Sequence, residues 1–259
     1  MVNVKASKIF NTSLALIFVA CESILFYMIH IDHTATEISL RYLTIQIAAV
    51  FAWLLLVGEL MKAKECGKGV TSVIFNLKNG NLLRLAALCT LGADFFLVAS
   101  PTTDKMKGMI FFTGTQIFIF LHLYLREESK KRRTANLCTR IVASALLVVI
   151  TLFVLGENAD SLAIISIVYY ANLLTSMVFS PFDKRGGKLL CLGLILFALC
   201  DINVGLWVLN DMYTGGFPEG SLLHSLLYSG VDLVWIFYIP SQMLIPLSLL
   251  AGKKEHTAI

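Results

Sequence analysis

The sequence has few charged residues, and this scarcity argues against a soluble fold. Asp, Glu, Lys and Arg make up 15% of the 259 residues, whereas a soluble domain carries about 25%. Several catalytic motifs are also missing: there is no glycine-rich nucleotide loop, no GxSxG elbow and no HExxH pair. These absences exclude the nucleotide-binding enzymes, serine hydrolases and zinc proteases that such motifs identify.

The cysteines and basic residues are arranged in ways that exclude two further classes. The six cysteines form no CxxC pair and no Cys/His cluster with zinc spacing, so we expect neither a disulfide framework nor a metal site. The net charge of +4 comes from basic residues that alternate with apolar runs. We therefore expect no nucleic-acid partner.

Long apolar runs dominate what is present, since 57% of the residues are hydrophobic. A helix needs about 20 apolar residues to cross the hydrocarbon core. The predicted spans are 9–29, 40–61, 81–100, 107–125, 137–155, 161–180, 187–209 and 229–250. The sequence thus predicts an all-α, polytopic integral membrane protein, with residues 1–259 as one eight-helix domain. The apolar stretch 221–228 is alternatively an interfacial helix beside the last span.

The basic residues predict an orientation for this bundle. Of the 21 Lys and Arg residues, 18 lie in the tails or in the loop regions after the second, fourth and sixth spans. The positive-inside rule then places both termini in the cytoplasm. The short loops and tails favour a bacterial inner (plasma) membrane over a eukaryotic endomembrane.

Two aspartates lie deep inside apolar stretches. Asp94 stands in NLLRLAALCTLGADFFLVAS and Asp201 in GKLLCLGLILFALCDINVGLWVL. A carboxylate in hydrocarbon costs roughly 2.5–3.5 kcal/mol on insertion scales, so it is typical of a functional site. Both aspartates, and Glu22 in the first span, lie roughly 20 Å above the predicted cytoplasmic boundary. We expect the three acids to share one polar cavity, with structural contacts between helices as the alternative.

The two aspartates also follow similar short stretches, LCTLGAD and LFALCD, four spans apart. This similarity predicts a 4+4 parallel repeat, with chance as the alternative. Four further polar residues within spans are second-tier candidates for the cavity: His122, Tyr170, Asn172 and Gln242. Their structural interpretations are an interfacial histidine, a core tyrosine and amides that hold helices together.

The residues around both aspartates follow motifs of a known family. Residues 89–97 are similar to S-x-x-G-D-x-x-L, with the aspartate in place and the glycine one position early. The seventh span is similar to G-x-x-x-F-x-x-S-D, which Gly193, Phe197, Cys200 and Asp201 meet with cysteine in place of serine.

Three more motifs lie on the fourth, sixth and eighth spans. They are F-x-x-G-x-x-x-F-x-x-x-H-x-x-Y, a Tyr followed by a Met, and Y-x-x-x-Q-x-L-I. The residues that meet them are Phe111, Gly114, Phe118, His122, Tyr124 (one position early), Tyr169 or Tyr170, Met177, Tyr238, Gln242, Leu244 and Ile245.

These five motifs, in this order, resemble the YhhN family of eight-helix membrane proteins, which includes the TMEM86-type lysoplasmalogenases. The resemblance runs from about the third span to the end of the chain. It implies hydrolysis of the vinyl ether bond of a lysophospholipid, the lysoplasmalogen, to a fatty aldehyde and glycerophospho-ethanolamine or -choline. The departures beside the aspartates allow a different substrate within the same fold.

The residues suit this chemistry independently of the resemblance. A vinyl ether hydrolyses by protonation at its β-carbon, and water captures the resulting oxocarbenium ion. The reaction needs one protonated acid and a second carboxylate that stabilises the cation and activates water, as in glycosidases. We therefore predict Asp94 and Asp201 as the catalytic pair, with no cofactor.

Two other functions use the same features. Intramembrane acids at one depth also suit a proton relay in a proton-coupled transporter, and the predicted repeat favours that function. The third alternative is a non-catalytic protein that binds membrane lipid. The sequence indicates no oligomeric state.

Overall fold

Long helices occupy most of the chain. The structure, a computed structural model, describes residues 3–30, 38–67, 69–212, 216–228 and 230–251. The long helices are α1 (Asn3–His30), α2 (Ile38–Glu65), α4 (Asn81–Asp94), α5 (Lys105–Arg126), α6 (Lys130–Leu155), α7 (Ser161–Phe179), α8 (Gly187–Met212) and α10 (Leu233–Ala251). The short helices are α3 (Val70–Ile74) and α9 (Leu222–Leu227). No strand occurs within the described ranges.

The structure confirms the predicted eight-helix membrane protein. Within the described residues, eight helical segments are long and apolar enough to cross a membrane. The largest boundary error concerns α6, which begins at Lys130 rather than at the predicted 137. Hydropathy marks the part of a helix that lies in hydrocarbon, whereas the helix itself continues through the charged turn that precedes it. The chain is therefore a multi-pass integral membrane protein.

The region before the last span divides into two helices. The apolar stretch 221–228 contains α9, and α10 begins at Leu233, four residues after the predicted start. Residue 229, where we placed that start, lies outside the described residues. Both Pro240 and Pro246 lie inside α10.

Side-chain caps define several helix starts. Asp104 accepts a hydrogen bond from the backbone N–H of Lys107 at 3.0 Å, and Asp160 accepts one from Ala163 at 2.7 Å. Such caps satisfy N–H groups that have no partner within the helix. The bond from Lys107 also lowers the pKa of Asp104.

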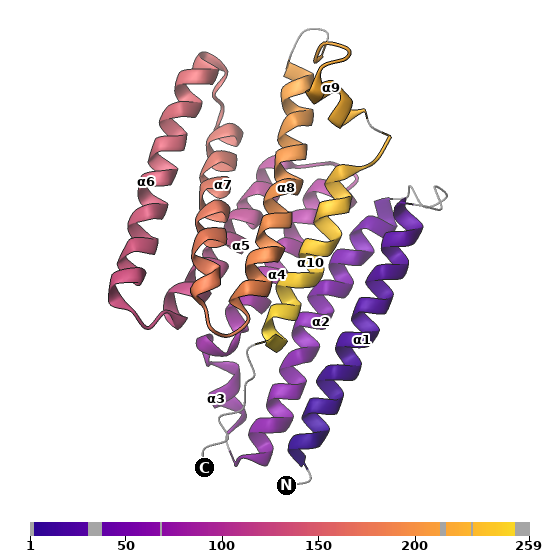
Figure 1. The fold of residues 1–259 in the computed structure, drawn as a ribbon, viewed down its shortest axis with the longest axis vertical. Helices are drawn as coiled ribbons and strands as arrows, with labels where there is room; N and C mark the ends of the chain where they lie inside the picture. The colour runs from indigo at the N-terminus through magenta and orange to yellow at the C-terminus, as the bar shows by residue number, and fades with distance from the viewer. Residues whose placement is uncertain (1–2, 31–37, 68, 213–215, 229, 252–259) are drawn as a thin grey trace.

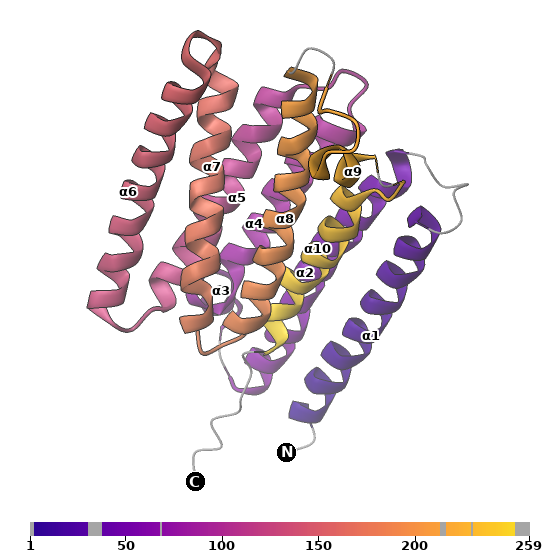
Figure 2. The same cartoon turned by 45° about the horizontal axis from the view of Figure 1, so that its top comes forward.

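Six of the long helices form a closed ring. In order around the ring, α2 packs against α4, α4 against α5, α5 against α7, α7 against α8, α8 against α10, and α10 against α2. Figures 1 and 2 show α1 and α6 at opposite edges of this bundle. The principal hydrophobic core takes buried side chains from all six ring helices, so the ring interior is where side chains from distant parts of the sequence meet.

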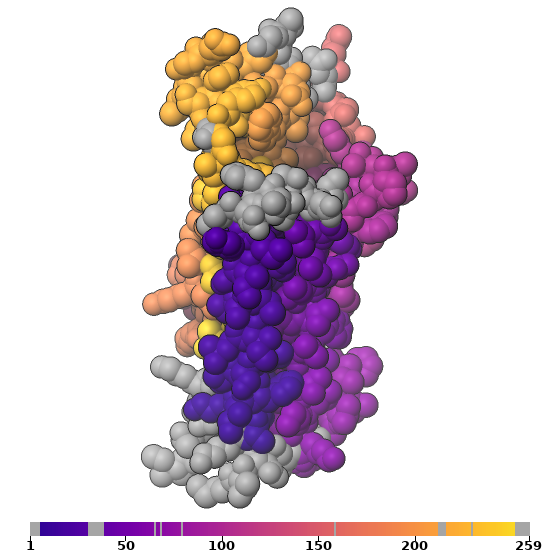
Figure 3. Space-filling view, turned by 90° about the vertical axis from the view of Figure 1, so that its right-hand side faces the viewer, coloured from indigo at the N-terminus to yellow at the C-terminus, as the bar shows by residue number. Residues whose placement is uncertain are grey.

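The two peripheral helices cover the ring from outside. Phe18 of α1 stacks on Phe51 of α2, with ring centroids 4.0 Å apart, and Figure 3 shows α1 lying beside α2. Most side chains of α6 are exposed or half-exposed, and its neighbour is α7. In a membrane these exposed apolar surfaces face lipid.

The order of the helices has a regularity that bears on the predicted repeat. The helices α1 and α6 each lie outside the ring and each precede three consecutive ring spans. A 4+4 repeat requires this arrangement, and the repeat itself stays a prediction. The first residue of α1 and the last of α10 lie toward the same end of the bundle (Figure 1). The assignment of that end to the cytoplasm also stays a prediction.

Candidate active site

Asp94 lies at a break in its helix. It is the last residue of α4, and the next five residues, 95–99, form one turn of π-helix in which the N–H of Ser100 donates to the carbonyl of Phe95 at 2.7 Å. Single π-turns are frequent at functional sites. The side chain of Asp94 is buried, and its carboxylate accepts a hydrogen bond from the hydroxyl of Tyr238 on α10 at 2.5 Å.

Asp201 has an equivalent partner from a different helix. It lies in the middle of α8 and accepts a hydrogen bond from the hydroxyl of Tyr169 on α7 at 2.7 Å. Its side chain is partly exposed, in contrast to that of Asp94. Tyr170, the tyrosine that we predicted for the site, is half-buried and lies within reach of the charge of Asp201. The hydrogen bond to Asp201 is therefore formed by Tyr169, and not by Tyr170.

Aromatic rings fill the space between the two hydrogen-bonded pairs. Phe197 lies 5.4 Å from Tyr238 and 6.4 Å from Tyr169, measured between ring centroids. Phe112 of α5 lies 5.6 Å from Tyr169 and 5.7 Å from Phe197. These separations are typical of favourable aromatic pairs. Both tyrosines are thereby held by ring contacts as well as by their carboxylate partners.

The two hydrogen-bonded pairs share a contact with one aromatic ring. Tyr238, which bonds to Asp94, and Tyr169, which bonds to Asp201, both contact the ring of Phe197. Two carboxyl groups in one apolar interior suit acid–base chemistry, in which one donates a proton and the other accepts one. Asp94 and Asp201 thus border the same group of aromatic rings, and their role as a catalytic pair stays a prediction.

Gln242 lies in a neighbouring polar cluster of the ring interior. Its amide donates to the hydroxyl of Ser241 at 3.3 Å, and it borders a void of about 10 Å³ between α2, α4, α5 and α10. Thr90 and Thr115 line the same void and hydrogen-bond to each other at 3.2 Å. The void is about the size of one water molecule, so Gln242 has no room for a lipid there.

Glu22 lies on α1, outside the ring, whereas both aspartates lie on ring helices. Its side chain is buried, and α1 packs against α2 and α10 outside the ring. One of its carboxyl oxygens has no hydrogen-bond partner among the described residues. The polar cavity that we expected the three acids to share therefore stays a prediction.

His122 belongs to an ionic cluster near the end of the bundle. Its Nε2 lies 2.7 Å from Nη1 of Arg126 and 3.7 Å from the carboxylate of Asp183, and Arg126 pairs with Asp183 at 3.2 Å. Burial raises the pKa of Asp183, and Arg126 acts against that rise. Along α5, His122 lies ten residues beyond Phe112, or about 15 Å.

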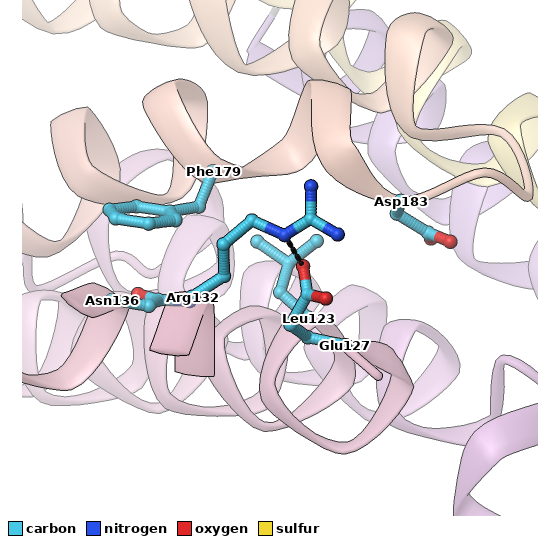
Figure 4. A pocket seen from close by; sticks show the side chains of 6 residues that line it. All are labelled: Leu123, Glu127, Arg132, Asn136, Phe179 and Asp183. Atoms are coloured by element: carbon cyan, nitrogen blue, oxygen red, sulfur yellow. Dashed lines mark ion pairs between the residues drawn. The ribbon is translucent and has the colours of Figure 1, made fainter. Parts of the chain in front are cut away.

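A small pocket adjoins this cluster (Figure 4). Its volume is about 10 Å³, and it lies between α5, α6 and the end of α7. The side chain of Arg132 extends along it and pairs with Glu127 at 3.0 Å. The pocket is too small for an organic ligand, and its charged groups hold the helix ends together.

Asn172 belongs to another polar cluster, between α7 and α6. Its side-chain oxygen accepts a hydrogen bond from Arg140 of α6 at 3.0 Å, and Arg140 also donates to Asn136 at 2.9 Å and to Ser176 at 2.9 Å. The guanidinium lies 4.5 Å from the ring centroid of Phe120. Asn172 thus faces α6 and joins a peripheral helix to the ring.

The sequence analysis missed two parts of the site. The first is the role of Tyr238 and Tyr169 as partners of the aspartates, although both stood in the motifs. The second is an ion pair between Arg41 of α2 and Asp232, at 2.8 Å, with the guanidinium 5.4 Å from the ring centroid of Trp235. The available signal was that Arg41 is one of only three basic residues on the side opposite the other 18.

The donor set and the comparisons with known proteins complete the description of the site. In the part of the chain that the structure describes, no three His, Cys, Asp or Glu residues lie together as a metal site would require.

No curated protein matches the sequence, and no solved structure matches it. The YhhN family model matches residues 36–249, which include both aspartates and both tyrosines. Because this match covers most of the sequence, the chain belongs to the YhhN family.

Proposed function

We propose that the protein is a membrane-embedded hydrolase of the lysoplasmalogenase type, with Asp94 and Asp201 as its catalytic pair. One observation carries this proposal: two carboxylates from α4 and α8, each hydrogen-bonded to a tyrosine, border one group of aromatic rings. Membership of the YhhN family supports a lysolipid as the substrate. A one-tailed lipid also suits an intramembrane site, because its chain can stay in hydrocarbon while the head group enters the protein.

The proposed reaction uses only proton transfer and water. One aspartate in its protonated form gives its proton to the β-carbon of the vinyl ether, and the double-bond electrons form the new C–H bond. The resulting oxocarbenium ion takes up water, from which the other aspartate accepts a proton. The hemiacetal then collapses to a fatty aldehyde and the free glycerol hydroxyl. Protons return to the starting carboxyl groups, as general acid–base catalysis requires.

The tyrosines and the phenylalanines have separate parts in this mechanism. Tyr238 and Tyr169 fix the orientation of the carboxylates toward the reacting carbons, which is a positioning role. Phe112 and Phe197 lie between the pairs, where their ring faces can stabilise the oxocarbenium charge by cation–π attraction. Their apolar surface also limits the number of water molecules near the cation.

The experiment that tests this proposal measures aldehyde release from a lysoplasmalogen by the purified protein in detergent. Asp94→Asn and Asp201→Asn should each abolish release while the protein stays folded. Glu22→Gln is the matched control, because it neutralises another buried acid outside the ring, and it should retain release. A lysolipid with a saturated ether should not be cleaved, since it has no carbon to protonate. Full activity in both asparagine variants contradicts the proposal.

A second candidate function is proton-coupled transport. The observation that favours it is Glu22, a buried acid with one carboxyl oxygen that has no hydrogen-bond partner among the described residues. Intramembrane acids of this kind often bind protons. Substrate-driven proton flux in proteoliposomes, lost in Glu22→Gln but without aldehyde release by the wild type, would favour this function over hydrolysis.

A further inference from the structure

A large pocket lies beside the candidate active site, at the end of the bundle where α8 ends and α10 begins. Its volume is about 450 Å³, and α8, α9 and the segment before α10 line it. Small-molecule sites usually have volumes of about 300–1,000 Å³. Its chemically distinctive lining residues are Trp207, Tyr228, Asp232 and Asn203. The pocket therefore has the size and the polar groups of a ligand site.

Two aromatic rings form one part of the lining. Trp207 and Tyr228 lie 5.4 Å apart between ring centroids, with their planes nearly perpendicular. The ring of His224 lies 4.5 Å from that of Tyr228, and the hydroxyl of Tyr228 accepts a hydrogen bond from Asn210 at 3.3 Å. Trp207 is 40% exposed and Tyr228 is 54% exposed, so both rings remain accessible. Aromatic rings of this kind attract ammonium groups by cation–π interaction.

One member of a charged pair lines the pocket, and the other lies next to it. Asp232 lines it and pairs with Arg41, and the side chains of both residues are partly exposed, at 37% and 27%. An accessible carboxylate beside an accessible guanidinium presents both signs of charge at one place. A zwitterion with a phosphate and an ammonium group is the complementary ligand, because arginine binds phosphate and carboxylate binds ammonium.

The start of α10 leads from this pocket toward the catalytic pair. Asp232, Trp235 and Tyr238 follow at intervals of three residues, and the rings of Trp235 and Tyr238 are 5.4 Å apart. Six residues of helix correspond to roughly 9 Å, and Tyr238 then bonds to Asp94. In a lysoplasmalogen, seven bonds separate the phosphorus from the β-carbon of the vinyl ether, which is on the order of 9 Å when extended.

We propose that this pocket is the head-group subsite for a zwitterionic lysophospholipid. This proposal rests on the proposed function. Trp207, Tyr228 and Asp232 bind the choline or ethanolamine ammonium, and Arg41 binds the phosphate. The glycerol unit then lies along α10 past Trp235, which brings the vinyl ether to the aspartates. The pocket thereby selects lipids that carry both a phosphate and an amine.

The test compares binding by Trp207→Leu and Trp53→Leu in full-length protein reconstituted in nanodiscs. Trp53 lies on α2 and is 37% exposed, so it matches Trp207 in residue type and exposure. The probes are two radiolabelled one-chain lipids with a saturated ether, one with a phosphocholine head group and one with phosphate alone. Neither is a substrate for vinyl ether hydrolysis, so binding is read independently of turnover.

We expect Trp207→Leu to weaken binding of the phosphocholine lipid about three- to tenfold and to leave the phosphate lipid unchanged. Trp53→Leu should alter neither. Equal binding of the phosphocholine lipid by both variants overturns the subsite, and so does an equal loss for both lipids in Trp207→Leu. If the expected pattern appears but the wild type releases no aldehyde, the subsite stands as a lysolipid site while the proposed hydrolysis fails. If aldehyde is released but the pattern is absent, the hydrolysis stands without the subsite.

Discussion

Removal of one hydroxyl group, in Tyr238→Phe, tests the geometry of the proposed site most directly. The substitution deletes the hydrogen bond to Asp94 and keeps the ring, which packs against Phe197 and Trp235 at 5.4 Å each. A hydrogen bond to a charged group contributes about 1.5–3 kcal/mol. Each 1.36 kcal/mol corresponds to about a factor of ten in rate. If the bond orients the carboxylate for proton transfer, kcat/KM should fall about tenfold to 150-fold.

The assay is aldehyde release under single-turnover and steady-state conditions, with Tyr27→Phe as the control. Tyr27 lies on α1, is 55% exposed, and its hydroxyl should be dispensable. Because Tyr238 acts through Asp94, the loss should appear in kcat with KM nearly unchanged. A double-mutant cycle on thermal stability with Asp94→Asn should also give a coupling energy of about 1–3 kcal/mol. Wild-type kcat in Tyr238→Phe, or strictly additive stability effects, would refute the positioning role.

Three further predictions concern the framework around the site. Asn172→Ala should lower the free energy of unfolding by about 1–3 kcal/mol, because Arg140 loses a hydrogen-bond acceptor. KM should stay unchanged. A raised KM would instead place Asn172 in the substrate site. Gly186→Ala should lower Tm at least about 3 °C more than Gly220→Ala. Both glycines have positive φ, but of the two only Gly186 has a carbonyl oxygen of α10 where a Cβ would lie. Equal Tm values for the two variants would contradict this packing. Burial raises the folded-state pKa of Asp183 above 3.8, so its ionisation costs stability in the folded protein. Thermal stability should therefore fall as the pH rises above 3.8. Asp183→Asn should make Tm less dependent on pH in this range. An unchanged pH dependence of Tm in this variant would show that Asp183 does not cause it.

The membrane architecture and the central pair of acids could be predicted from the sequence. Apolar runs of spanning length are a one-dimensional property, because every backbone polar group in hydrocarbon must be satisfied within its own helix. The free-energy cost of a charge inside the membrane likewise indicates that Asp94 and Asp201 are functional, without knowledge of the fold. The order of short motifs around them was sufficient to indicate the family that the comparison then confirmed.

The direction in which each polar side chain points could not be predicted. A helix that is apolar on all sides has no clear polar face, so the sequence does not distinguish Tyr169 from Tyr170 or reveal that Asn172 faces α6. The π-turn after Asp94 has no local signal of its own, since ordinary apolar residues form it.

Hydropathy along the chain was enough to predict eight membrane-spanning helices and the three acids that lie deep within them. The tertiary structure alone decided which side chains meet. The closed ring brings Asp94 to Tyr238 across 144 residues of sequence, while α1, which carries Glu22, lies outside the ring. The physical reason is that hydrophobicity sets the depth of a residue along its own helix, whereas contact between helices depends on their rotation and on the neighbours that close packing selects.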